Sequence, residues 1–151
     1  MKTQLRKLTV IILAAIFWNC SMIAEGPPPY TITKPVFETS QRSYVFTYAG
    51  LSFYLMNNTQ KTINSIKVSF MLFDSKTKSS PFIGSNIFEI TVNDTIHPDE
   101  NREILISLDK YVHTAPAEPY LIDYFHISQI NYSDGSIWRD KYGTYNTGTL
   151  K

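Results

Sequence analysis

The sequence predicts an all-β fold, either an antiparallel sandwich or a barrel. From about Tyr44 onward, apolar and polar residues alternate with a period of two, and turn-forming clusters interrupt the alternation at intervals of roughly a dozen residues. Aromatic residues make up 14% of the chain, with ten Tyr and nine Phe, and this composition is typical of a folded β-rich domain. A chain of 151 residues is long enough for one domain with a hydrophobic core.

The individual strands follow from the alternation. Leu51, Phe53 and Leu55 share one face of a short segment, which indicates a half-buried strand. A second alternating segment ends at Asp74, where a polar loop begins. We expect strands at 51–55, 66–72, 84–92, 102–108, 121–131 and 136–142. Polar or proline-rich breaks separate them at 57–61, 75–80, 97–100, 114–119 and 134–135.

The last two strands are predicted to form a hairpin. Asp134 and Gly135 stand between two apolar segments, and an Asp-Gly pair in this position is a strong hairpin signal. The physical reason is that both residue types tolerate a positive φ.

The start of the chain has the layout of a secretory signal. Lys2, Arg6 and Lys7 form a basic region, and residues 8–18 form an uncharged apolar run. The run is short for a membrane span. We therefore expect residues 1–19 to be a signal peptide of the lipoprotein type.

The only cysteine, Cys20, directly follows this apolar segment. A bacterial lipoprotein signal ends in a cysteine that is lipidated and becomes the first residue of the mature chain, so we expect a lipid on Cys20. Asn19 is atypical, because the usual motif has Gly or Ala there. Two alternatives stay open, namely ordinary cleavage after Ala24 and an uncleaved N-terminal anchor. A lone cysteine excludes an internal disulfide and every multi-cysteine metal site.

The remaining chain divides into three predicted segments. Three consecutive prolines at 27–29 favour an extended spacer, so residues 20–41 are predicted to be a tether. The sandwich is predicted at 42–145, and a C-terminal tail at 146–151.

The charge of the chain argues against nucleic acid as a partner. The formal net charge is +1, and removal of residues 1–19 leaves 11 basic and 13 acidic residues. Phosphate binding requires clustered Lys and Arg, which a mildly acidic domain does not provide.

Three short motifs resemble a known family. Phe70-Met71-Leu72-Phe73-Asp74 resembles the F-x-L-Y-D signature of the FxLYD domain, with Phe73 in place of Tyr. Residues 96–100 resemble the Pro-Gly-Glu turn of such domains, and residues 134–138 resemble the closing D-G-x-x-W hairpin of related sandwiches. The resemblance extends over about residues 45–142. It implies an immunoglobulin-like sandwich of about seven strands on the outside of a cell, in a family without a general activity. It also implies structural roles for Phe70, Leu72, Phe73 and Asp74.

No catalytic or metal-binding pattern stands out. His97, His113 and His126 are widely spaced, and no cysteine of the domain supplements them, so we expect no metal site and no cofactor. A nucleophile elbow is missing from the sequence. Asp99 and Glu100 fit a solvated turn better than a catalytic carboxyl pair. We therefore expect that the protein is not an enzyme.

The best candidate for a contact surface is the loop at 111–120. It is long, proline-rich and flanked by aromatic residues, and we single out Tyr111, His113 and Tyr120. The expected function is that of a lipoprotein of the bacterial cell envelope, which is held to a membrane through Cys20 and faces the periplasm or exterior. It would present a surface to a protein or glycan partner. The alternative is a periplasmic carrier of a small ligand or a metal.

Overall fold

The computed structural model describes residues 27–39, 42 and 44–147, and within them the prediction of an all-β antiparallel sandwich is confirmed. No helix in these ranges is long and apolar enough to cross a membrane. The strands of the described residues are β1 (Tyr30–Ile32), β2 (Val36–Glu38), β3 (Gly50–Asn57), β4 (Ile63–Phe73), β5 (Ile87–Ile96), β6 (Asn101–Ser107), β7 (Leu121–Tyr132) and β8 (Ile137–Arg139).

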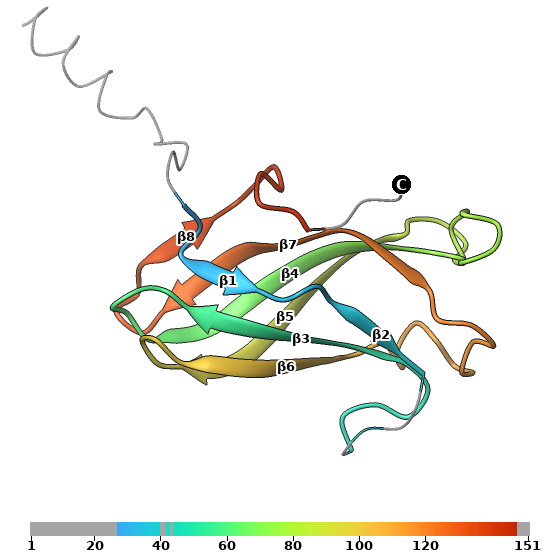
Figure 1. Ribbon diagram of the computed structural model, residues 1–151, viewed down its shortest axis with the longest axis horizontal. Helices are drawn as coiled ribbons and strands as arrows, with labels where there is room; N and C mark the ends of the chain where they lie inside the picture. The colour runs from blue at the N-terminus through green and yellow to red at the C-terminus, as the bar shows by residue number, and fades with distance from the viewer. Residues whose placement is uncertain (1–26, 40–41, 43, 148–151) are drawn as a thin grey trace, which may run out of the picture.

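The strands form two sheets (Figure 1). In the first sheet β3 is central, because β1 and β2 pair with one of its edges and β6 pairs with the other. The second sheet has the order β5-β4-β7-β8. All pairings are antiparallel, and the chain passes between the sheets at the β3–β4, β5–β6 and β6–β7 connections. This division of strands is that of an immunoglobulin-like sandwich.

The core lies between the inner faces of the two sheets. Leu51, Phe53 and Leu55 are buried on one face of β3, as their alternation predicts. From the facing sheet, the ring of Phe125 packs edge-on against Phe53 at 4.9 Å. Burial of each such side chain contributes roughly 1.5–3 kcal/mol to stability, so this interface accounts for most of the driving force for folding.

The sandwich begins earlier than the sequence predicts. Residues 20–41 are predicted to be a tether, but β1 and β2 lie within them and pair with β3. Tyr30 packs edge-on against Trp138 at 5.6 Å, and Phe37 packs against Tyr120 at 5.1 Å. These strands escape prediction because they are short and lie beside prolines, which hides the alternation. The described residues therefore form eight strands rather than about seven.

The C-terminal boundary also differs from the prediction. The N–H of Thr147, in the predicted tail, donates to the carbonyl oxygen of Phe125 at 2.7 Å. The last strand ends at Arg139 and does not continue to residue 142, because buried Asp140 accepts hydrogen bonds from backbone N–H groups further along the chain and starts a turn.

The predicted hairpin is present, but only one of its two turn residues has a positive φ. Gly135 has φ of 82°, and its N–H donates to the carbonyl oxygen of Tyr132. Asp134 stabilises the turn through its side chain. The carboxylate accepts the N–H of Ser136 at 2.9 Å and forms an ion pair with Lys61 at 2.8 Å. Asp is therefore favoured here for its hydrogen bonds, and glycine for its backbone.

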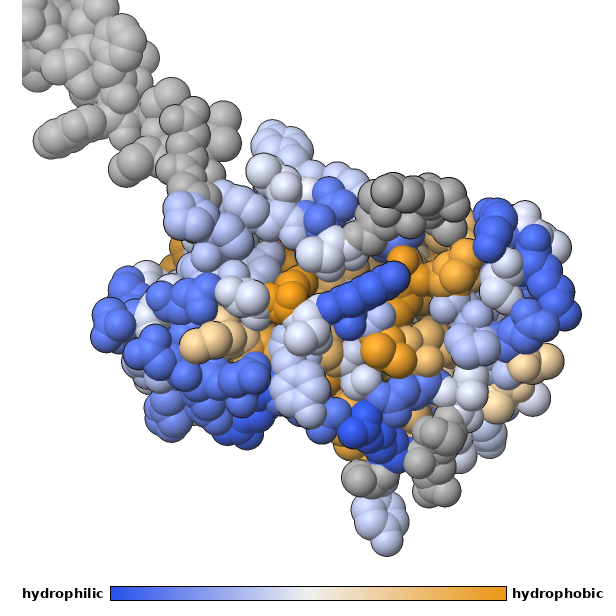
Figure 2. Space-filling model, in the orientation of Figure 1, coloured by the Kyte–Doolittle hydropathy of each residue, from blue (hydrophilic) through white to orange (hydrophobic). Residues whose placement is uncertain are grey.

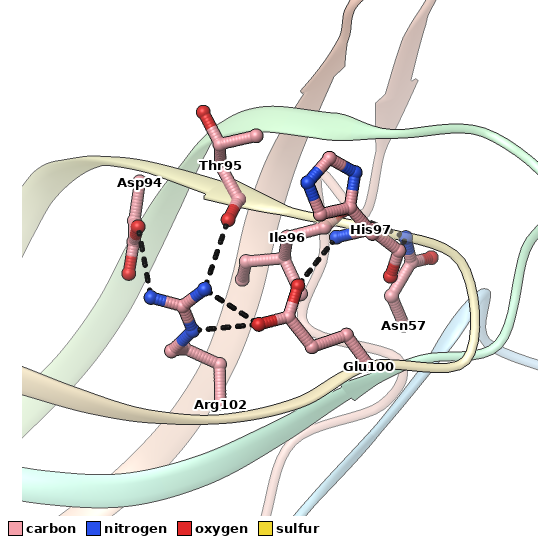
Figure 3. A network of polar contacts seen from close by, with 7 residues as sticks. All are labelled: Asn57, Asp94, Thr95, Ile96, His97, Glu100 and Arg102. Atoms are coloured by element: carbon pink, nitrogen blue, oxygen red, sulfur yellow. Dashed lines mark hydrogen bonds and ion pairs between the residues drawn. The ribbon is translucent and has the colours of Figure 1, made fainter.

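A buried amide fixes the end of the sandwich where β3–β4 and β5–β6 turn. Asn57 is fully buried, and Figure 3 shows it beside the β5–β6 turn. Its Nδ2 donates to the carbonyl oxygens of Lys61 (2.8 Å), Ile96 (3.1 Å) and His97 (3.2 Å). One side chain thus satisfies backbone acceptors of two separate turns, as buried polar groups must be satisfied.

Charged side chains reinforce the β5–β6 turn (Figure 3). Glu100 accepts the backbone N–H of His97 at 2.8 Å and also pairs with Arg102. The pKa of the Glu100 carboxyl is lowered, chiefly by the hydrogen bond from the His97 N–H and secondly by the hydrogen bond from Arg102. Asp99 has a φ of 57°, so the position where the resembled turn has glycine does require a left-handed backbone.

Candidate functional site

The two ends of the sandwich differ (Figure 1). We call the end with the β3–β4, β5–β6 and β7–β8 turns the turn end. The described chain begins there, because the carbonyl oxygen of Pro29 accepts the N–H of Asn58 at 3.0 Å. We call the opposite end the loop end, where the longer connections 74–86 and 108–120 lie with the described part of 39–49.

Tyr111 and His113, predicted to belong to a contact surface, lie at the loop end. The side chain of Tyr111 is 39% exposed, and its ring packs edge-on against Phe88 at 4.9 Å. His113 is exposed. Tyr111 is therefore an aromatic residue that faces solvent while the core holds its ring in place.

Tyr120, the third predicted contact residue, has a different environment. It is partly buried, and its ring packs against Phe37 at 5.1 Å and Phe82 at 5.8 Å. The structure thus brings Tyr111 and Tyr120 into one aromatic cluster, in which Phe82 and Phe88 lie 5.2 Å apart. Tyr120 supports the loop end from within rather than lying on its surface.

A pocket of about 430 Å³ opens at the loop end beside Tyr111. Its most exposed member is Ile83, whose side chain is fully accessible to solvent. We call it the apical pocket, and it is lined by Pro81, Phe82, Ile83, Ser85, Ile87, Phe88, Glu89 and Tyr111. The strand pattern and the motifs of the sequence do not predict this pocket. The signal was the apolar Pro81-Phe82-Ile83 triplet in an otherwise polar loop.

Another apolar area lies on the outer face of the first sheet. Figure 2 shows hydrophobic surface in the middle of this face, interrupted by hydrophilic side chains. Val36, Tyr54 and Met56 are exposed there, on β2 and β3. Polar residues divide this apolar area.

An aspartate anchors the β2–β3 loop. The carboxylate of Asp109 accepts the backbone N–H groups of Thr47 (2.6 Å), Tyr48 (2.8 Å) and Ala49 (3.2 Å). Burial raises the pKa of Asp109, but the hydrogen bonds from Tyr48, Thr47 and Ala49 outweigh it, and the net pKa is lowered. The loop is therefore attached to the start of the β6–β7 connection.

The signature residues are placed in the core and at the start of the β4–β5 loop. Phe70 and Leu72 are fully buried, and Phe73 is partly buried. Asp74 accepts the backbone N–H groups of Thr77 at 2.7 Å and Lys76 at 2.9 Å, and these hydrogen bonds lower its pKa.

An ion pair joins two of the loops. Nζ of Lys76 lies 2.9 Å from the carboxylate of Glu118, which also accepts the hydroxyl of Ser75. The hydrogen bond with Glu118 raises the pKa of Lys76, and the same bond lowers the pKa of Glu118. The connections at the loop end are therefore held by the hydrogen bonds of Asp109 and Asp74 and by this ion pair.

The histidines lie in separate places. His97 is exposed in the β5–β6 turn, His113 is exposed in the β6–β7 loop, and His126 is buried on β7. Within residues 27–39, 42 and 44–147, no group of three or more His, Cys, Asp or Glu side chains is arranged to hold a metal ion. The predicted lipidation site, Cys20, and the predicted signal peptide at 1–19 lie outside the described residues.

These observations define the class of the protein as an antiparallel β-sandwich with an elaborated loop end. No protein-family model matches the chain, and no curated protein matches it. Among solved structures, it is similar to the X-ray structure of a hypothetical protein from Peptoclostridium difficile 630, with 12% sequence identity and a TM-score of 0.55. The match covers 77% of this chain and 88% of that chain, and it shows a shared fold.

Proposed function

We propose that this protein is a non-enzymatic, membrane-tethered β-sandwich of the bacterial cell envelope that binds a protein partner through its loop end. The observation that carries the proposal is the apical pocket, in which a fully exposed Ile83 stands beside a Tyr111 ring that rests on the core. Contact of apolar side chains with water is unfavourable. A group of exposed apolar side chains is therefore typical of an interaction site.

The pocket favours a protein partner because six of its eight lining residues are apolar or aromatic. Aromatic anchors held by a rigid surrounding lose little conformational entropy on binding, and such residues dominate the energy of protein interfaces. Glu89 in its lining and Lys110, whose Nζ lies 5.7 Å from the Tyr111 ring centre, provide polar groups around the apolar surface. The partner is expected to insert an apolar side chain between Ile83 and Tyr111.

The position of the chain start supports a tether. The described chain begins at the turn end, so a lipid on Cys20 upstream of it would leave the loop end unobstructed. The resemblance to the FxLYD domain agrees with this placement outside the cytoplasm. The lipid is tested by labelling cells with a palmitate analogue. Wild-type protein is expected to incorporate the label and Cys20→Ala to lose it, whereas equal incorporation in both would overturn the anchor.

The binding surface is tested by photo-cross-linking in cells that express the full-length chain. A photoreactive amino acid at Ile83 is expected to give a discrete adduct with one protein. The matched control is Ile137, an isoleucine that is 48% exposed on β8, where no such adduct is expected. The same adduct from both positions, or none from Ile83, would contradict the proposal.

A further inference from the structure

A second cavity, with a different chemistry, lies on the outer face of the second sheet. It has a volume of about 420 Å³ and is open to solvent. We call it the outer groove, and its lining includes Lys67, Glu89, Tyr124, Arg139, Lys141 and Tyr142. Glu89 and Ile87 also line the apical pocket, so the two cavities adjoin, but the outer groove is rich in charged and hydrogen-bonding groups.

The backbone of β7 is distorted where it borders the groove. Tyr124 has a φ of 52°, which a bulky residue rarely adopts. The register of β7 against β4 shifts between Ser69 and Met71, so a bulge lies at this position. Bulges of this kind redirect a side chain and are common beside functional sites, as is local backbone strain.

The Tyr124 ring is held in one position. Its hydroxyl donates to the carbonyl oxygen of Tyr142 at 2.6 Å, and its ring packs edge-on against His126 at 5.4 Å. The ring also lies against Gly143, where an added Cβ would come within 2.8 Å of it. The strained tyrosine, 39% exposed, therefore presents a fixed aromatic surface to the groove.

His126 adds a buried polar group to the same cavity. It is only 4% exposed, and its Nδ1 lies 3.0 Å from the carbonyl oxygen of Tyr124. Since a carbonyl oxygen only accepts, Nδ1 carries the hydrogen. Within the described residues Nε2 has no hydrogen-bond partner, and His126 lines the groove. This leaves a positioned nitrogen for a ligand.

The positive charges of the groove are only partly compensated. Lys67 has Glu89 at 3.9 Å, but across the described residues neither Arg139 nor Lys141 has a carboxylate within ion-pair distance. Nε of Arg139 donates to the side-chain oxygen of Gln129 at 3.1 Å, which orients the guanidinium, and no described residue bonds its terminal nitrogens. A local excess of positive charge thus lies on a domain that is acidic as a whole.

We propose that the outer groove binds a saccharide chain that carries carboxylate groups. The guanidinium of Arg139 matches a carboxylate in shape and charge. The negative faces of Tyr124 and Tyr142 suit the C–H groups of a sugar ring. A shallow, open groove accommodates a linear chain, and its few cations are too sparse for a dense phosphate polymer.

The proposal is tested by titration calorimetry on the full-length chain in detergent. The probes are a short oligogalacturonate, the carboxyl-reduced neutral oligosaccharide of the same length, and inorganic polyphosphate. We expect the oligogalacturonate to bind, the neutral sugar to bind at least about tenfold more weakly, and polyphosphate not to compete at moderate salt.

Variants locate the site. Arg139→Ala and Tyr142→Ala are each expected to weaken oligogalacturonate binding about tenfold, since both side chains are exposed and their removal spares the core. Lys141→Ala is compared with Lys110→Ala, because both lysines precede a tyrosine and lie 5.7 Å from its ring centre, but only Lys141 lines the groove. Only Lys141→Ala is expected to weaken binding.

Three results would overturn the proposal, namely no binding of oligogalacturonate, equal binding of the neutral sugar, or polyphosphate binding of equal strength. Unchanged affinity in Arg139→Ala and Tyr142→Ala would also exclude the groove as the site. These results are independent of cross-linking from Ile83, so failure of this proposal leaves the loop-end function to be judged separately.

Discussion

The turn end and the loop end of this sandwich are stabilised by different interactions. At the turn end, fully buried Asn57 donates to backbone carbonyls of two turns, and Glu100 accepts the backbone N–H of His97. At the loop end, Phe88 supports an exposed Tyr111 ring, and Ile83 is left fully in solvent. The comparison shows that a buried amide joins the turns at one end, while exposed apolar side chains lie at the other.

The largest effect is expected at the turn end. Asn57→Ala would remove a buried donor from the carbonyl oxygens of Lys61, Ile96 and His97, and we expect a loss of about 3 kcal/mol in the free energy of unfolding. Urea denaturation measures it. The control is Asn58→Ala, since among the described residues the Asn58 amide donates only to the hydroxyl of Thr31, at an exposed site. Equal losses in both variants would refute the role of the buried amide.

A smaller effect is expected where the β2–β3 loop is packed against β3. A Cβ at Gly50 would lie 2.3 Å from the ring of Phe46, which is itself buried. We expect Gly50→Ala to cost about 2 kcal/mol through overpacking. If the ring is the cause, adding Phe46→Leu should recover part of the loss in the same denaturation assay, and no recovery would point to the backbone instead.

Acid is expected to loosen the loop end. The pKa of Asp109 is lowered from 3.8, so its ionised form contributes stability above about that pH and the contribution is lost as the pH falls below it. Asp109→Asn removes the titration. We therefore expect the urea midpoints of wild type and variant to differ near neutral pH and to approach each other as the pH falls below 3.8. A difference between the two urea midpoints that does not change with pH would show that the charge of Asp109 does not contribute to stability.

The smallest change in stability is expected at the apical pocket. Ile83 is fully exposed, so Ile83→Ser should alter the free energy of unfolding by less than about 0.5 kcal/mol. A markedly destabilised variant would show that Ile83 serves the fold and not a partner.

Much of the fold could be predicted from the sequence because apolar residues alternate at 51–55 of β3 and 66–72 of β4, and Asp134-Gly135 marks the last hairpin. The strands β1 and β2 could not be predicted, because three residues are too few to show an alternating pattern. Their position is determined by pairing with the long strand β3. The site was harder to predict. Tyr111 was identified from its loop, but the outer groove depends on the left-handed backbone of Tyr124, which tertiary contacts impose.

We propose that the loop end binds a protein through Tyr111 and Ile83. The most direct test is the yield of the cross-linked adduct from Ile83 in a Tyr111→Ala background, compared with Tyr54→Ala, a tyrosine that is 47% exposed on the outer face of β3. We predict that Tyr111→Ala abolishes the adduct while Tyr54→Ala leaves it unchanged. An adduct that survives Tyr111→Ala at full yield would contradict the claim.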